Sequence, residues 1–187
     1  MTDLYKVDWT QIPTPVDDGG ASHLPGTRFP SIELRATNGE MVNFTNLDGR
    51  IVVYAYPMTG RPDVPLPDGW DMLPGARGCT PQSCDFRDHL DELIQLGVSR
   101  IFGISTQETE YQKEAVDRLH LPFALLSDVN LLLQNTLNLP VMMVQDMTLL
   151  KRLTMIIDDG CITHVFYPVF PPHESAVSVI QWLNKRA

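Results

Sequence analysis

The chain has 187 residues, 43% of them hydrophobic and 20% charged, which is the composition of one folded domain rather than of a disordered chain. Its net charge of −9 comes without any lysine- and arginine-rich run, which argues against a nucleic-acid partner. No apolar run reaches the ~18 residues of a membrane span, and the N-terminus lacks the pattern of a signal peptide. We therefore expect a cytoplasmic protein without a membrane or nucleic-acid partner.

The first part of the chain predicts an arm and then a β-hairpin. Residues 1–24 are polar and are expected to form an N-terminal arm, so that the folded domain covers 25–187. Apolar and polar residues alternate over 29–35, as in a half-buried strand. Asn38-Gly39 then predicts a hairpin turn into a second strand over 41–44.

A buried strand, a long loop and a helix follow. Residues 51–56 are continuously apolar, as in a central strand covered on both faces, and Pro57 ends this run. The prolines and glycines of residues 58–73 predict a long loop, which in a compact domain is usually functional or disordered. Thr80-Pro81 predicts the start of a helix, with Thr80 as N-cap, and Gly97 predicts its end.

The second half of the chain alternates between strands and helices. The expected elements are a strand over 99–106, a helix over 108–119, a strand over 123–126, a helix over 130–139, paired strands over 153–157 and 161–167, and a final helix from 171 to 183. This order, with a terminal hairpin and helix after the β-α-β units, predicts an α/β fold, a thioredoxin-like α/β sandwich with an N-terminal β-hairpin.

Two of the three cysteines lie around the predicted start of the helix after the loop. Cys79 precedes the helix, where unpaired N–H groups and the helix dipole favour an anion, and thiols so placed have lowered pKa values. Cys84 follows five residues later, on the face expected to be polar. Five helical residues span about 7.5 Å along the axis, whereas bonded cysteines keep their Cα atoms within roughly 7 Å. A bond between them would require the first helical turn to unwind.

The stretch Gly78-Cys79-Thr80-Pro81-Gln82-Ser83-Cys84-Asp85-Phe86-Arg87-Asp88 resembles the Q-type (bacterioferritin-comigratory) peroxiredoxins. Gly103-Ile104-Ser105-Thr106, Leu125-Leu126-Ser127-Asp128 and residues 151–158 match the same family in its order, and the resemblance covers about residue 25 to the C-terminus. It implies a thiol-dependent peroxidase that reduces hydrogen peroxide or organic hydroperoxides.

The resemblance also implies a role for individual residues. Cys79 would be the peroxidatic cysteine, which becomes a sulfenic acid, and Cys84 the resolving cysteine, which condenses with it to a disulfide. Arg152 would orient the peroxide and hold the thiolate, and Pro57 would shield the site. The implied partners are the peroxide and a thioredoxin- or glutaredoxin-type reductant. We expect no cofactor or metal, and a monomer or weak dimer.

The sequence departs from the family before the first cysteine. Pro57 and Cys79 are 22 positions apart (79 − 57), whereas the family pattern Pro-x-x-x-Thr/Ser-x-x-Cys separates them by seven, which implies an insertion. Position 76 is alanine, although family members use a hydroxyl there to bind the peroxide. Thr59 is our candidate for the replacing hydroxyl, and Thr80 is the second candidate.

Two other functions remain open at this point. A thioredoxin-fold protein could use the Cys79 and Cys84 pair to sense redox state or to bind a metal without turning over peroxide. The five histidines show no metal-ligand spacing with the cysteines, which counts against the metal. A disulfide reductase is disfavoured because the chain has no Cys-x-x-Cys.

Overall fold

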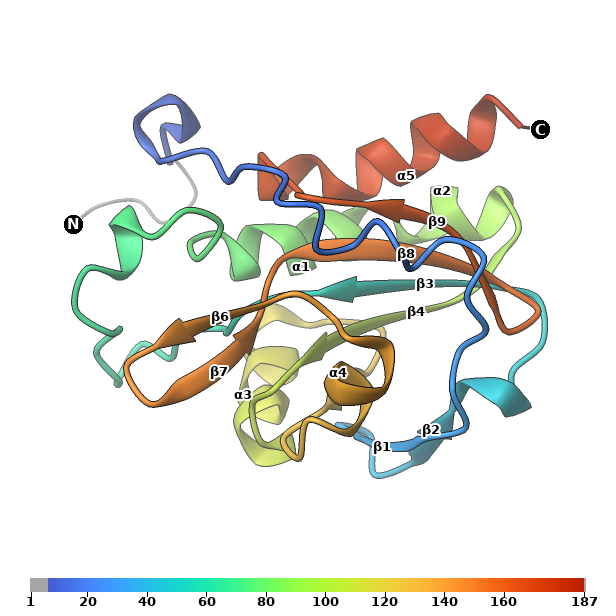
Figure 1. Ribbon diagram of the computed structural model, residues 1–187, viewed down its shortest axis with the longest axis horizontal. Coiled ribbons are helices and arrows are strands. Elements are labelled where there is room, and N and C mark those ends of the chain that lie inside the picture. Colours follow the sequence, from blue (N-terminus) through green and yellow to red (C-terminus); the bar gives the residue numbers. More distant parts are fainter. Residues whose placement is uncertain (1–6, 187) are drawn as a thin grey trace.

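The computed structural model describes residues 7–186, in which a seven-stranded sheet lies between two layers (Figure 1). The strand order is β2-β1-β5-β4-β3-β8-β9. The strands are β1 (Glu33–Ala36), β2 (Met41–Asn43), β3 (Arg50–Ala55), β4 (Val98–Ser105), β5 (Leu125–Ser127), β8 (Leu153–Asp158) and β9 (Cys161–Phe166). β4 pairs in parallel with both β3 and β5, and the other pairs are antiparallel. The predicted thioredoxin-like α/β fold and its N-terminal hairpin are confirmed.

Strand β3 separates two hydrophobic cores, because alternate side chains of a strand point to opposite faces. Ile51, Val53 and Ala55 lie in the core beneath α4 and the N-terminal segment, whereas Val52 and Tyr54 lie in the core shared with the other helices. The helices are α1 (Cys79–Asp88), α2 (Leu90–Gln95), α3 (Thr109–Leu119), α4 (Leu132–Leu137) and α5 (Ser175–Asn184). Within residues 7–186, no helix is long and apolar enough to cross a membrane.

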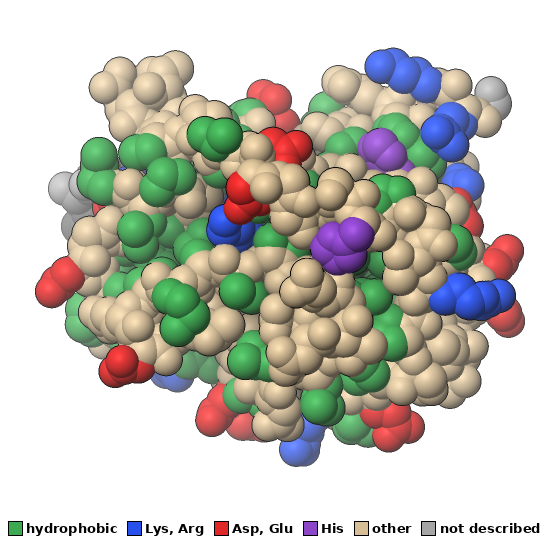
Figure 2. All heavy atoms as spheres, viewed as in Figure 1, with side chains coloured by type: hydrophobic (Ala, Val, Ile, Leu, Met, Phe, Trp, Pro, Cys, Tyr) green, Lys and Arg blue, Asp and Glu red, His purple; other side chains and the backbone are tan. Residues whose placement is uncertain are grey.

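A second, two-stranded sheet was not predicted. β6 (Val141–Val144) and β7 (Met147–Leu150) form an antiparallel hairpin that projects beside the main sheet (Figure 1). Its turn is made by Gln145, with φ of 52°, and Asp146. An Asn-Gly or similar pair would have signalled such a turn, and Gln145-Asp146 is not such a pair. Met143 is largely exposed on the hairpin. Other hydrophobic side chains are scattered over the face of the molecule that Figure 2 shows.

The helix expected to run from Thr80 to Gly97 is two helices. At His89 the backbone leaves helical geometry, and the ring Nδ1 lies 2.9 Å from the carbonyl oxygen of Asp85. The chain resumes as α2, where Ile94 is exposed rather than part of the expected apolar face.

The N-terminal segment packs onto the domain. Ala21 and Leu24 are buried in the same core as β3, so the end of the expected arm is part of the hydrophobic core. Asp18 forms a 2.6 Å ion pair with Lys151 and accepts a 2.7 Å hydrogen bond from the Tyr167 hydroxyl. These partners, Lys151 first, lower the pKa of Asp18. Residues 1–6 lie outside the described part, and the boundary at residue 24 stays a prediction.

Gly103 in β4 allows Tyr54 to pack against the sheet. A Cβ at this position would lie 2.5 Å from Leu125 Cδ2 and 2.6 Å from Tyr54 Cζ. The Tyr54 ring is held from the other side by Phe86 of α1, stacked at a centroid distance of 4.6 Å. The Tyr54 ring is therefore confined between Gly103 and Phe86.

We expect Gly103→Ala to lower the free energy of unfolding by about 1–3 kcal/mol, because overpacked side chains must leave their preferred rotamers. Urea unfolding measures this change. Arg100→Ala, on the exposed part of the same strand, is the control and should stay within about 0.5 kcal/mol of wild type. Equal stability of the two variants would contradict the packing argument.

Candidate active site

Cys79 is the first residue of α1, and its N-cap is Gly78, which has φ of 109°. The prediction of Thr80 as N-cap is therefore wrong, and the helix begins earlier than we predicted from the sequence. Gly78 is required here because a Cβ would overlap the Pro172 ring and lie 2.8 Å from Trp9 Cη2. A left-handed glycine cap brings Cys79 into the first turn, where the backbone N–H groups have no helical partners.

Arg152, between β7 and β8, lies against this first turn. Its Nη2 is 3.2 Å from Cys79 Sγ and within 3.3 Å of the carbonyl oxygens of residues 75–77, while Nη1 donates to Gln82 Oε1 at 2.5 Å. Both Arg152 and Cys79 are buried. Among the ion pairs of the described residues, none gives Arg152 a carboxylate. Among the side chains of the described residues that hydrogen-bond to Arg152, Cys79 is the ionisable one.

Gln82 is a site residue that the sequence reasoning missed. Its amide Nε2 donates to Ser175 Oγ at 3.3 Å, and Ser175 Oγ lies 3.0 Å from Thr154 Oγ1. Gln82 thus fixes the Arg152 guanidinium from one side and is itself fixed by the start of α5. Its position three residues after Cys79, on the same face of a helix, was the signal that could have identified it.

Asp85 joins the later part of α1 to α5. Its Oδ2 accepts a 2.6 Å hydrogen bond from the backbone N–H of Ala176, and Oδ1 lies 3.1 Å from His89 Nδ1. Burial raises the pKa of Asp85, whereas the Ala176 N–H and the charge of His89 act in the opposite direction. This contact anchors α1 immediately after Cys84.

Cys84 is half-buried and packs against the core of Tyr54 and Phe86, so its expected place on a polar face is wrong. Burial raises the pKa of the Cys84 thiol, and the Arg87 charge counteracts part of this effect.

Both cysteines line a cavity of about 320 Å³. Its walls are largely apolar: Trp9 comes from the N-terminal segment, and Met58, Leu66 and Trp70 come from the long loop. Trp70 is buried in a short 3-10 turn, Trp70–Met72, so this part of the loop is packed. Cys79 and Cys84 both belong to the uninterrupted helix α1. Their Cα atoms are thus about 7.5 Å apart along the axis, and a disulfide requires the first turn to unwind.

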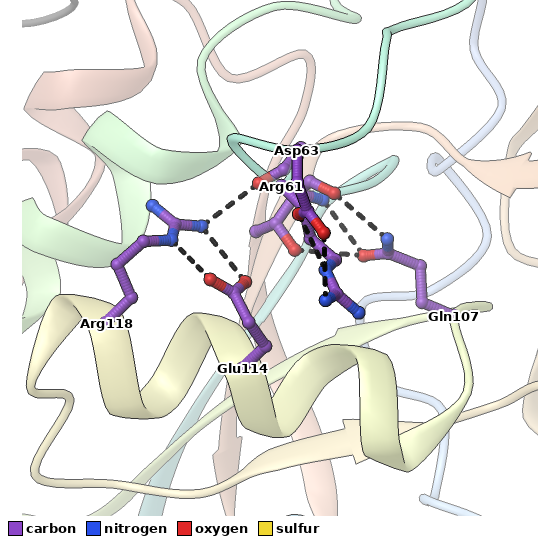
Figure 3. A network of polar contacts seen from close by, with 7 residues as sticks. Arg61, Asp63, Gln107, Glu114 and Arg118 are labelled. Carbon is purple, nitrogen blue, oxygen red and sulfur yellow. Dashed lines mark hydrogen bonds and ion pairs between the residues drawn. The ribbon is translucent and has the colours of Figure 1, made fainter.

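The two other predicted residues, Pro57 and Thr59, are not among the residues that line this cavity. Pro57 is buried just after β3. Thr59 is buried, and its hydroxyl donates to Gln107 Oε1 at 3.2 Å, while its N–H and carbonyl also bond to the Gln107 amide (Figure 3). In the described residues no hydrogen bond joins Thr59 to Cys79. Thr80, in contrast, lines the cavity beside Cys79.

A metal site has no support from the side-chain arrangement. Across residues 7–186, no group of 3 or more histidine, cysteine or carboxylate side chains is placed to hold a metal ion. The chemistry that the cavity offers is that of a thiol next to a buried guanidinium, with a second thiol in the same helix.

Comparison with known proteins gives consistent matches. The Redoxin family model matches residues 24–180. Peroxiredoxin Bcp of Escherichia coli (strain K12) is 32% identical over 167 residues, which are 87% of this chain and 96% of that protein. Chloroplastic peroxiredoxin Q of Oryza sativa subsp. japonica is 29% identical over 151 residues, 80% of this chain and 61% of that protein.

Solved structures share the fold. The crystal structure of peroxidoxin BcpB from Mycobacterium tuberculosis superposes with a TM-score of 0.70 at 22% identity, covering 87% of this chain and 97% of that one. Peroxiredoxin Q of Xanthomonas campestris gives a TM-score of 0.65 at 21% identity, covering 87% and 95%.

The Asp85 contact gives a test of how α1 is anchored. Asp85→Ala leaves the buried Ala176 N–H without its acceptor, and we expect the free energy of unfolding to fall by about 1–3 kcal/mol. Asp88→Ala removes a carboxylate of the same helix that is paired only at the surface, and should cost less than about 1 kcal/mol. Urea unfolding of both variants is the measurement. Equal losses would show that Asp85 does not anchor the helix.

Proposed function

The chain belongs to the Redoxin family and is a Q-type (bacterioferritin-comigratory) peroxiredoxin, a thiol-dependent peroxidase, and on this premise we propose that Cys79 is its peroxidatic cysteine. The observation that carries the assignment is the Arg152 guanidinium, 3.2 Å from Cys79 Sγ and buried with it. A guanidinium and the N-terminus of a helix both favour the thiolate, which is the nucleophilic form.

In the first step the Cys79 thiolate attacks one oxygen of the peroxide. The S–O bond forms as the O–O bond breaks, and the second oxygen leaves as water or an alcohol after taking a proton. Arg152 is placed to stabilise the charge that moves from sulfur to the leaving oxygen. Gln82 holds the guanidinium in position, and Pro57, buried at the end of β3, has the proposed role of limiting water near the sulfur.

In the second step we assign Cys84 as the resolving cysteine. The first turn of α1 unwinds, the Cys84 sulfur attacks the Cys79 sulfenic acid, and a disulfide forms with release of water. Both sulfurs line the same cavity, and the Asp85 contact holds the helix beyond Cys84. Only the first part of α1 therefore has to move.

The cycle closes when a thiol reductant reduces the disulfide. We propose a thioredoxin- or glutaredoxin-type protein for this step, because dithiol exchange through a mixed disulfide is what such a pair requires. The proposed compartment is the cytoplasm, where these reductants keep thiols reduced. The proposed assembly is a monomer or weak dimer, since both cysteines of the cycle lie in one chain.

Peroxide consumption in the presence of thioredoxin and its reductase tests the two cysteine roles. We expect Cys79→Ser to abolish turnover, since Cys79 is the thiol that contacts Arg152 within residues 7–186. Cys84→Ser should complete one oxidation and then stop, because the sulfenic acid has no partner. Peptide mapping of the wild type after one equivalent of peroxide should show a Cys79–Cys84 disulfide. Intact thiols at both positions would contradict the proposal.

The hydroxyl that contacts the peroxide is tested by a pair of matched variants. Thr59 can serve only after leaving Gln107, whereas Thr80 already lines the cavity. We expect Thr80→Val to lower kcat/KM about tenfold, the effect of losing one hydrogen bond of ~1.4 kcal/mol in the transition state. Thr59→Val should change it less. The opposite order would restore Thr59 as the peroxide-binding hydroxyl.

A further inference from the structure

Cys84 lies near two arginines that belong to different elements. Arg87 is on α1 itself; its Nε pairs with Asp88 at 2.8 Å and its Nη1 donates to the Leu119 carbonyl, at the end of α3, at 2.7 Å. Arg118 is in the last turn of α3 and lines the cavity together with Cys79 and Cys84. Arg118 has no part in the Arg152 network described above.

Three contacts fix the Arg118 guanidinium. Its Nε and Nη2 bind the two carboxylate oxygens of Glu114, at 2.7 and 3.3 Å, and Nη2 also donates to the Gly60 carbonyl at 3.0 Å (Figure 3). Gly60 belongs to the long loop and lines the same cavity. Arg118 thus connects the loop that covers the cysteines to a helix outside the segment that unwinds.

The second step of the cycle creates a need for such a cation. Cys84 must lose its proton to attack the sulfenic acid, and burial opposes this by raising the pKa of its thiol. The charges that act on Cys84 are Arg87 and Arg118, which favour the thiolate, and Asp88, which disfavours it. Arg87 is paired with Asp88 and is not among the residues that line the cavity, whereas Arg118 lines it together with Cys79 and Cys84.

We propose that Arg118 is a positioning residue for disulfide formation: it stabilises the Cys84 thiolate during its attack on the Cys79 sulfenic acid and holds the loop at Gly60 over the two sulfurs. This inference rests on the proposed roles of the two cysteines. In the step, the Cys84 sulfur forms the S–S bond as the S–O bond of Cys79 breaks. The hydroxide that leaves takes up a proton, which balances the one that Cys84 lost, and no other reactant is needed.

Rapid mixing of the reduced full-length protein with hydrogen peroxide separates the two steps. Trp9 and Trp70 both line the cavity, so intrinsic fluorescence should report oxidation of Cys79 and then disulfide formation. In Arg118→Met we expect the first phase to stay within about twofold of wild type, and the second to slow about tenfold, as for one pKa unit of lost thiolate stabilisation. The pH profile of the second phase should also shift to higher pH.

Arg118→Lys and Arg61→Met distinguish charge from a merely structural effect. Arg118→Lys keeps the charge, and its second phase should lie within about threefold of wild type. Arg61→Met removes a charge from the same cavity, where Arg61 pairs with Asp63 and covers the Tyr111 ring; it should leave both phases within about twofold, because a surface ion pair contributes little.

Several outcomes would overturn the proposal. They are a wild-type second phase in Arg118→Met, equal slowing of both phases, a tenfold loss in Arg118→Lys, or the same defect in Arg61→Met. If Arg118→Met does not fold, the rate and pH profile of Arg118→Lys decide. Failure of the underlying cysteine roles looks different, because the wild type itself would then form no Cys79–Cys84 disulfide.

Discussion

The buried charge of Arg152 is the constraint on which the site depends. A guanidinium removed from water needs compensating partners, and here these are backbone carbonyls of residues 75–77, the Gln82 amide and the Cys79 sulfur. The bonds from Arg152 to the carbonyls of residues 75–77 hold the backbone before α1 in place. Gly78, in its left-handed conformation, then directs the chain into the helix. The uncharged partners satisfy hydrogen bonds without cancelling the charge, and in the proposed cycle the thiolate of Cys79 is the negative charge that compensates it.

The covering of this site comes from segments that are distant in sequence. Trp9 reaches the cavity from the N-terminal segment, and Trp70 reaches it from the loop that follows Pro57. The loop is attached to the segment before α3 through the Thr59–Gln107 bonds and to α3 itself through Arg118 at Gly60 (Figure 3). Length and composition alone would have allowed this loop to be disordered. Its attachment explains how a chain with an extended approach to its cysteine still closes a mostly apolar cavity around it.

The sequence was most informative where local chemistry decides structure. The continuous apolar run over 51–56 predicted a buried strand, and β3 confirms it. The position of Cys79 near the start of a helix could be predicted from the residues that follow it. Contacts between residues far apart in the sequence could not be predicted. The contacts of Gln82 with Arg152 and Ser175, and of Asp85 with Ala176, depend on how distant segments such as α5 pack. The interruption at His89 and the turn at Gln145 were missed because ordinary residues adopt unusual backbone conformations there. Cys84 was predicted to lie on the polar face because Arg87, Asp88 and Asp91 follow it in the sequence. In the structure it packs against the core.

If the first turn of α1 unwinds as proposed, the Asp85 contact separates this turn from the later part of the helix, which stays folded. In the proposed cycle, the stability of the first turn sets how long a sulfenic acid at Cys79 waits for Cys84. During this interval a second peroxide molecule can oxidise the same sulfur to the sulfinic acid, which a thiol does not reduce. The strength of the contacts around the first turn therefore determines the lifetime of the sulfenic acid. In the proposed cycle it would set the peroxide concentration above which the enzyme inactivates itself, and tighter packing of this turn would lower that threshold.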